Sequence, residues 1–294
     1  MNARQVWHTW RRILADDDLV AHVSDPATQP AGARAALAPA AQAILDDYAG
    51  TPQATATNIG MYRRGLTRNA LGTLSLVPLT RHLLFMTDLD IDTVAERFVA
   101  TSGYRDFGPN FWESAGAFVA FLATLPEFAH PAWQDATALD AATVTLALRL
   151  GRNAPPAWPA DRAAPSAVTA VTAVTRIAAN PAAAIIASRH DLSGWIEHPQ
   201  DFDPGNLPPA VPSFWLVYFA TAESTPAYVQ LSERAARLVT LLATPCRASD
   251  AAVALGVPIA QVLDIVAALS ELGMVGVADE PVRSAMPADA PLPA

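Results

Sequence analysis

Apolar residues recur every three to four positions through the first half of the chain, which is the spacing of amphipathic helices. Between residues 4 and 23, for example, Val6, Trp10 and Ile13 fall on one helical face. The same spacing, broken by turn-rich segments, predicts further helices at 33–48, 62–85, 92–103, 110–125 and 139–150. Because no strand pattern competes in this half, residues 1–150 are predicted to form an all-α domain.

A proline-rich stretch follows the helical half. Residues 151–166, GRNAPPAWPADRAAPS, hold four prolines and little apolar periodicity, so we interpret them as an interdomain linker. The last residues, 281–294, are polar and proline-rich, and they are predicted to be a disordered tail.

β-Branched residues become frequent after this linker. Residues 168–180 predict a strand, with a helix as the rival, and 181–188 predict a second strand. Trp215–Ala220 and Ala227–Leu231 then flank a short polar turn, which indicates a β-hairpin.

Three short helices are predicted directly behind the hairpin. Ser232 caps the first, the second ends at Gly256, and the third runs from Pro258 to Gly273. A short sheet that precedes three helices gives residues 167–280 a winged-helix-like topology. The whole chain is therefore assigned to the α+β class.

Charge and composition restrict the cellular setting. The formal net charge is -9, which argues against nucleic acid as a partner, because phosphate binding needs a basic face. Cys246 is the single cysteine, so the chain forms no internal disulfide, as fits a reducing compartment. No uninterrupted apolar run reaches the roughly 20 residues that cross a bilayer. We expect a cytoplasmic protein that has no membrane partner.

The sequence lacks the motifs of common enzymes. All 19 basic residues are arginine, so no lysine is available for phosphate binding or Schiff-base chemistry. The six histidines are scattered. The densest set of metal-binding residue types lies in RHDLSGWIEH at 189–198, and we interpret its members as polar residues on the protein surface. We expect no catalytic residue, metal or cofactor in this chain.

Arg63, Arg64, Arg68 and Arg81 form the main concentration of basic residues in this acidic chain. Three interpretations are open at this point. The arginines could pair with the chain's own carboxylates, form a contact surface for an acidic partner protein, or contact nucleic acid.

The third helix of the C-terminal half would be the recognition helix of a DNA-binding winged helix. Its sequence, PIAQVLDIVAALSELG, contains no basic residue and carries Asp264 and Glu271, which repel phosphates. A peptide suits it better. The hairpin strand can lie at a sheet edge beside this helix, where a peptide would pair as an added strand. The predicted pairing edge is Tyr228, Val229, Gln230 and Leu231, and the predicted apolar groove wall is Val262, Ile265, Val266 and Leu269.

Residues 231–275, LSERAARLVTLLATPCRASDAAVALGVPIAQVLDIVAALSELGMV, carry a family resemblance. Their pattern of apolar positions resembles the helical part of the elements that bind precursor-peptide leaders in ribosomal natural-product pathways. The peptide chaperone of pyrroloquinoline quinone biosynthesis is a familiar member. The resemblance implies that this half of the chain binds a leader peptide.

The N-terminal half carries a second resemblance. MYRRGLTRNALGTLSLVPLTRHLL, VAERFVATSG and FGPNFWESAGAFVAFLATLPEF, followed by TRIAANPAAAIIASRHDLSGWI, resemble a bacterial family once labelled putative DNA-binding. The chain has Asn180-Pro181 where that family usually has His-Pro. Such proteins are partners of multinuclear iron-dependent oxidases, which are TIM barrels, in methanobactin- and thiaglutamate-type pathways. The resemblance implies that iron is bound by the partner enzyme and not by this chain.

Together these features lead to one functional hypothesis and two rivals. We expect a non-catalytic partner protein that holds the leader of a ribosomal precursor peptide and presents the core, at cysteine or another residue, to an iron oxidase. The arginine group would contact that oxidase. The rivals are a winged-helix transcriptional regulator, which would bind DNA in a salt-sensitive way, and an enzyme that acts alone.

Overall fold

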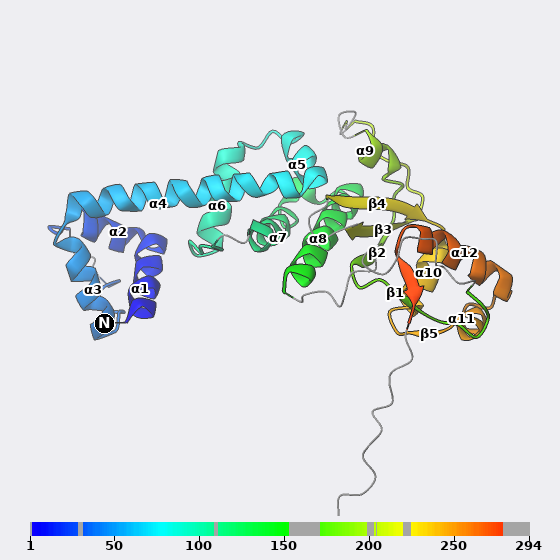
Figure 1. Cartoon of the computed structure of the whole chain (residues 1–294). Coiled ribbons are helices and arrows are strands. Elements are labelled where there is room, and N and C mark those ends of the chain that lie inside the picture. The colour runs from blue at the N-terminus through cyan, green and yellow to red at the C-terminus, as the bar shows by residue number, and fades with distance from the viewer. Residues whose placement is uncertain are drawn as a thin grey trace, which may run out of the picture. The chain divides into compact units, whose positions relative to one another are not determined.

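The structure is a computed structural model, and it describes residues 2–28, 32–108, 111–152, 171–198, 203, 205–219 and 225–278. Most of the predicted linker, 153–166, and the predicted tail, 281–294, lie outside these residues. The chain divides into two compact units (Figure 1). The first comprises Met1–Leu148 with Gly194–Pro208, and the second comprises Arg149–Ser193 with Pro209–Ala294. Residues 194–208 therefore group with the first unit, whereas the sequence placed them in the C-terminal domain.

The described part of residues 2–152 is helical, as the apolar spacing predicted. Its helices are α1 (Ala3–Ala15), α2 (Asp17–Ser24), α3 (Pro39–Ala49), α4 (Pro52–Gly72), α5 (Pro78–Phe85), α6 (Ile91–Thr101), α7 (Phe111–Leu122) and α8 (Pro131–Arg152), with short 3-10 turns at Thr73–Leu76 and Pro126–Phe128. Residues 151 and 152, predicted to begin the linker, are the last residues of α8.

Within the first unit, the long α4 helix connects two groups of helices (Figure 1). Near its start, α4 packs on α1–α3 around Trp10, Leu14 and Leu45, all buried. Towards its other end it contacts α6 and α7, where Phe98 and Phe118 lie with their ring centroids 4.8 Å apart. Helix α4 therefore contributes to both groups of packed helices in this unit and connects them.

The second unit contains two three-stranded antiparallel sheets, which confirms the α+β class. One sheet has the order β2-β3-β4, formed by Ala183–Ser188, Ser213–Phe219 and Pro226–Leu231. The other has the order β5-β1-β6, formed by Cys246–Arg247, Arg176–Ala179 and Val275–Val277. The short helix α9 (Ser193–Glu197) lies between β2 and β3 in the sequence. The predicted hairpin is present as β3 and β4.

Three helices follow β4 in the order that the sequence predicted. They are α10 (Glu233–Leu241), capped by the Ser232 side chain, α11 (Ala248–Leu255), which ends at Gly256, and α12 (Ile259–Glu271). Gly256 adopts the left-handed conformation (φ 65°) that a helix end of this kind needs, and that is the reason for a glycine there. The prediction that all strands precede the helices was wrong, because β5 follows α10 and β6 follows α12. These strands have two and three residues, too few to produce an alternating pattern.

Candidate peptide-binding site

Strand β4 lies at an edge of its sheet. Within the described residues it pairs with β3 alone, in a register that joins Leu216 to Val229 and Trp215 to Gln230. Pro226 is the first residue of β4, a position where a missing N–H is tolerated. In an antiparallel pair, alternate N–H and C=O groups of each strand point away from the partner strand. The outer groups of β4 are therefore in position to pair with a further strand.

The side chains of β4 alternate between two faces. Val229 and Leu231 pack against the apolar core that the helices of the second unit form. Tyr228 and Gln230 take the other face, and the Gln230 Nε2 donates to the Asp191 Oδ1 at 3.4 Å. The predicted pairing edge is thus correctly placed on a strand, but two of its four side chains serve the domain's own core. A bound peptide would contact mainly the backbone of β4.

The predicted groove wall on α12 needs correction. Val262 and Val266 are fully buried and Leu269 is 3% exposed, because these residues lie at positions i, i+4 and i+7 and form the stripe that faces the core. Ile265 also packs against that core, but it keeps part of its surface exposed. Of the four predicted wall residues, Ile265 is therefore the one that a peptide can reach without repacking the domain.

A polar contact joins the start of α10, the helix that follows β4, to the start of α12. Arg234 follows β4 by three residues, and its Nη1 donates to the Gln261 Oε1 in the first turn of α12 at 3.3 Å. Asp264 is exposed one turn later. The second unit therefore offers an edge strand, β4, the partly exposed Ile265 on α12, and a few polar groups. This combination suits an extended peptide.

The arginine group divides into inward and outward members. The Arg63 Nη2 donates to the Leu14 carbonyl at 2.5 Å, its Nη2 also lies 3.6 Å from the Asp17 carboxylate, and its guanidinium stacks over Tyr104 at 4.9 Å. The Leu14 carbonyl belongs to the last turn of α1, where carbonyls lack helical partners. Arg63 is thus a cap for α1, which the sequence did not predict, and its pair with Asp17 is of the kind that the internal-pairing interpretation expected. Its guanidinium is therefore engaged by groups of the first unit.

The other three arginines are placed differently. Arg64 and Arg68 are exposed on α4, and Arg81 on α5 is half-buried. The Nε atom of Arg81 is buried and has no hydrogen-bond partner among the described residues. Only Arg64 and Arg68 therefore offer whole guanidinium groups to a partner.

This division predicts different stability effects for neighbouring substitutions. We expect Arg63→Ala to lower the free energy of unfolding by about 2 kcal/mol, since it removes a charged hydrogen bond and a cation–π contact. Arg64→Ala, the matched control, is expected to change it by less than about 0.5 kcal/mol. Urea titration of both variants measures the difference. Equal effects would show that Arg63 does not cap α1.

Cys246 is half-buried and His190 is buried. Burial raises the pKa of the Cys246 thiol, with Asp250 adding to the effect, so the reactive thiolate is disfavoured. His190 is 9% exposed, and its carbonyl accepts hydrogen bonds from the Ser188 and Ser213 hydroxyls. His190 was interpreted as a surface residue, and that was wrong. Among the described residues no three His, Cys, Asp or Glu side chains are grouped so that they could hold a metal ion.

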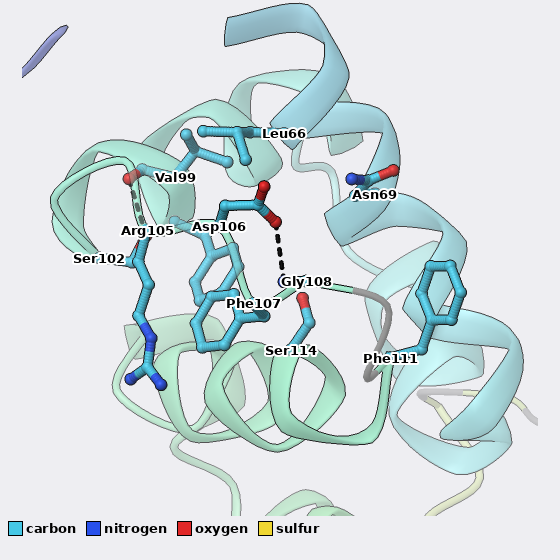
Figure 2. Close-up of a pocket in the computed structure, with 11 residues that line it drawn as sticks. Leu66, Asn69, Val99, Ser102, Arg105, Asp106, Phe107, Gly108, Phe111 and Ser114 are labelled. Carbon is cyan, nitrogen blue, oxygen red and sulfur yellow. Dashed lines mark hydrogen bonds between the residues drawn. The ribbon is translucent and has the colours of Figure 1, made fainter. Parts of the chain in front are cut away.

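The first unit contains a small cavity between α4, α6 and α7 (Figure 2). Its volume is about 20 Å³, room for roughly one water molecule. The Arg105 guanidinium lies over Phe107 at 4.7 Å, and the Asp106 carboxylate accepts a bond from the Gly108 N–H at 2.8 Å. These polar groups are occupied by local structure, so the cavity does not resemble a substrate site.

The second unit contains a shallow apolar groove of about 510 Å³ around the turn between α11 and α12. Ala252, Val257 and Ile259 line it, together with Ser249 as a polar member. None of the described residues that line it has a charged or titratable side chain.

Comparisons with known proteins add no relative. No protein-family model matches the chain, and no curated protein matches it significantly. No single helix among the described residues is both long enough and apolar enough to cross a membrane.

Proposed function

We propose that this chain is a non-catalytic partner protein that binds the leader of a ribosomal precursor peptide. It would present the core peptide to a multinuclear iron oxidase of the TIM-barrel class, which supplies the iron and modifies the core at cysteine or another residue. The observation that carries the proposal is the position of β4 at a sheet edge, with Ile265 of α12 partly exposed in the same domain.

Strand addition suits such a task physically. A leader that pairs along β4 gains several backbone hydrogen bonds, each contributing about 0.5–1.5 kcal/mol net. Its alternate side chains would face Ile265 and the neighbouring apolar surface. The order of elements, with β3 and β4 before α10–α12, supports the interpretation as a winged-helix-like domain with its sheet first.

The rival function, a transcriptional regulator, receives little support from α12. Its exposed side chains include Gln261, Asp264 and Glu271. Two carboxylates on the face that would enter a DNA groove oppose phosphate binding. A regulator would need a basic surface elsewhere in the second unit.

The direct test is a titration of the purified full-length chain into a fluorescently labelled peptide that spans the leader of a neighbouring precursor gene. We expect saturable binding in the micromolar range, about 8 kcal/mol, with a scrambled peptide as the control. Size-exclusion chromatography after co-expression with the neighbouring oxidase tests the second partner. If the chain does not bind the leader but binds duplex DNA, the result would instead favour the transcriptional regulator.

The proposed roles of the two proteins also predict which of them contains metal. Because the described residues bring no three ligand-type side chains together, we expect the chain purified alone to hold no stoichiometric iron or zinc, and the oxidase to retain its iron. Elemental analysis by mass spectrometry checks both proteins. A full equivalent of tightly held metal in this chain would place chemistry here and contradict the proposed role.

A further inference from the structure

Charge is segregated along this chain. The 40 residues between Asp47 and Asp88 contain no carboxylate and four arginines, whereas the other 15 arginines share the rest of the chain with all 28 carboxylates. The segment therefore has a formal charge of +4 and the remainder -13. A basic segment within a protein of the opposite sign indicates a local role for its charge.

The structure shows where this charge is exposed. Within the segment, α4 carries Arg64 and Arg68 on its surface, and Met61, 60% exposed, lies one turn before Arg64. Positions i, i+3 and i+7 share one helical face, so these residues form a continuous strip, the α4 stripe, of Met61, Arg64 and Arg68. Arg63, next to the stripe in sequence, points instead to the carbonyl of Leu14.

The two guanidinium groups of the stripe lack internal counter-charges. No carboxylate among the described residues forms an ion pair with Arg64 or Arg68. A Cβ added to Gly60 would meet the Arg64 Nη1 at 3.3 Å, so the guanidinium lies back along the helix over this glycine.

We propose that the α4 stripe docks a carboxylate-bearing helix or loop of the partner protein, which under the proposed function is the iron oxidase; the inference rests on that function. Arginine binds carboxylates through two parallel hydrogen bonds, and arginine and methionine are both enriched in protein interfaces. Nucleic acid fits less well. Two exposed guanidinium groups beside an apolar Met61 make a short contact, and the remaining charge of the chain repels a polyanion.

The test compares charge reversals at matched exposed positions. The Arg64→Glu/Arg68→Glu variant is expected to raise the Kd of the full-length chain for the purified oxidase by about tenfold or more, since two attractions become repulsions. The control, Arg12→Glu/Arg97→Glu, changes the net charge equally at exposed sites on α1 and α6 and is expected to leave the Kd within about threefold. Calorimetric titration measures both, after circular dichroism has shown unchanged helix content.

Two further measurements separate charge from shape. Arg64→Lys/Arg68→Lys keeps both charges and is expected to retain most of the affinity. Raising the salt from about 50 to about 300 mM is expected to weaken the wild-type complex much more than that of the Glu variant, because screening acts on the pairs that the variant lacks.

Each outcome has a defined meaning. Unchanged oxidase affinity in the Glu variant, or equal loss in the control, would overturn the α4 stripe while leader binding and the proposed function stand. An oxidase that does not bind even the wild-type chain would overturn the partnership and the stripe together. Binding of a duplex DNA probe that is lost in the Glu variant would reassign the stripe to nucleic acid.

Discussion

Of Val229→Pro and Gln230→Pro, the substitution at the residue whose N–H points away from β3 is expected to weaken leader binding about tenfold or more while leaving the protein folded. Neighbouring residues in a strand direct their N–H groups to opposite sides, so one of Val229 and Gln230 donates towards β3 and the other towards the open edge. Proline removes the N–H and blocks a close backbone approach. A tenfold loss corresponds to about 1.4 kcal/mol, within reach of one lost hydrogen bond and the distortion around it.

Val229→Pro and Gln230→Pro serve as controls for each other, because one interrupts the pairing with β3 and the other changes the outer edge. The proline that interrupts β3 pairing is expected to lower stability, whereas the one at the edge is expected to lower leader affinity alone. Val229 also packs against the core, so its replacement carries a packing cost that exposed Gln230 does not. Urea titration separates the two effects before any binding is measured.

A change in the peptide avoids altering the fold altogether. N-methylation of the leader at alternate residues removes only the N–H groups that would pair with β4, and methylation at the residues between them is the control. We expect the loss of affinity to follow this alternation. A loss that ignores it would contradict strand addition even if the leader binds.

Ile265→Glu probes the helix side of the same site. A charge beside the bound leader is expected to weaken binding by about tenfold, because the carboxylate must lose water or exclude the peptide's apolar side chains. Ala267→Glu adds the same charge at an exposed α12 position around the helix and is the matched control. Full leader affinity in folded Ile265→Glu and in the edge proline would show that the leader binds elsewhere.

The parts of the fold that the sequence predicts are those with long or marked patterns. The β3–β4 hairpin has two β-branched and aromatic runs around a polar turn, and the three following helices each have an apolar stripe with a start or stop residue such as Ser232 or Gly256. The short strands β5 and β6 have no such signal. Their partner, β1, is distant in sequence, so only the tertiary structure identifies them.

The candidate site shows the same limit at the level of side chains. Periodicity identifies the apolar residues of α12, but it does not say which of them the domain itself covers. Val262, Val266 and Leu269 pack inward, and Ile265, about 100° around the helix from Val266, is only partly covered. Likewise, four arginines near one another in sequence gave no indication that Arg63 caps α1 while Arg64 remains exposed.

No sequence pattern singled out Asp140, but the structure shows that its side chain binds the start of helix α5. Helix α5 begins after Val77, which cannot cap it, and the Asp140 carboxylate from α8 accepts the Thr80 N–H at 2.7 Å instead. The side chain is fully buried, and its Oδ1 has no partner among the described residues. Burial raises the pKa of Asp140 from 3.8 to about 7, against the lowering effect of the Thr80 N–H.

A pKa raised by folding makes stability fall as the pH rises. The folded state holds its proton on Asp140 up to about pH 7, whereas the unfolded chain releases it near pH 3.8. The Asp140 contribution is therefore most favourable below about pH 4, decreases between about pH 4 and 7, and is constant above that. The slope is about 1.4 kcal/mol for each pH unit and flattens as the pH approaches 7, so the loss between pH 5 and 7 is about 2 kcal/mol.

Asp140→Asn is expected to abolish this pH dependence. The amide oxygen can still accept the Thr80 N–H, but the side chain cannot ionise, so the variant gains about 2 kcal/mol relative to wild type between pH 5 and 7. The absolute difference at one pH also includes the cost of the buried amide N–H groups, about 1–3 kcal/mol, so the change with pH is the decisive quantity. Urea titrations at about pH 5, 6, 7 and 8 measure it, with exposed Asp92→Asn as the control of equal charge. A gap between wild type and Asp140→Asn that stays constant over this range would mean that Asp140 is ionised in the folded protein, and α5 would then be capped by a charged group.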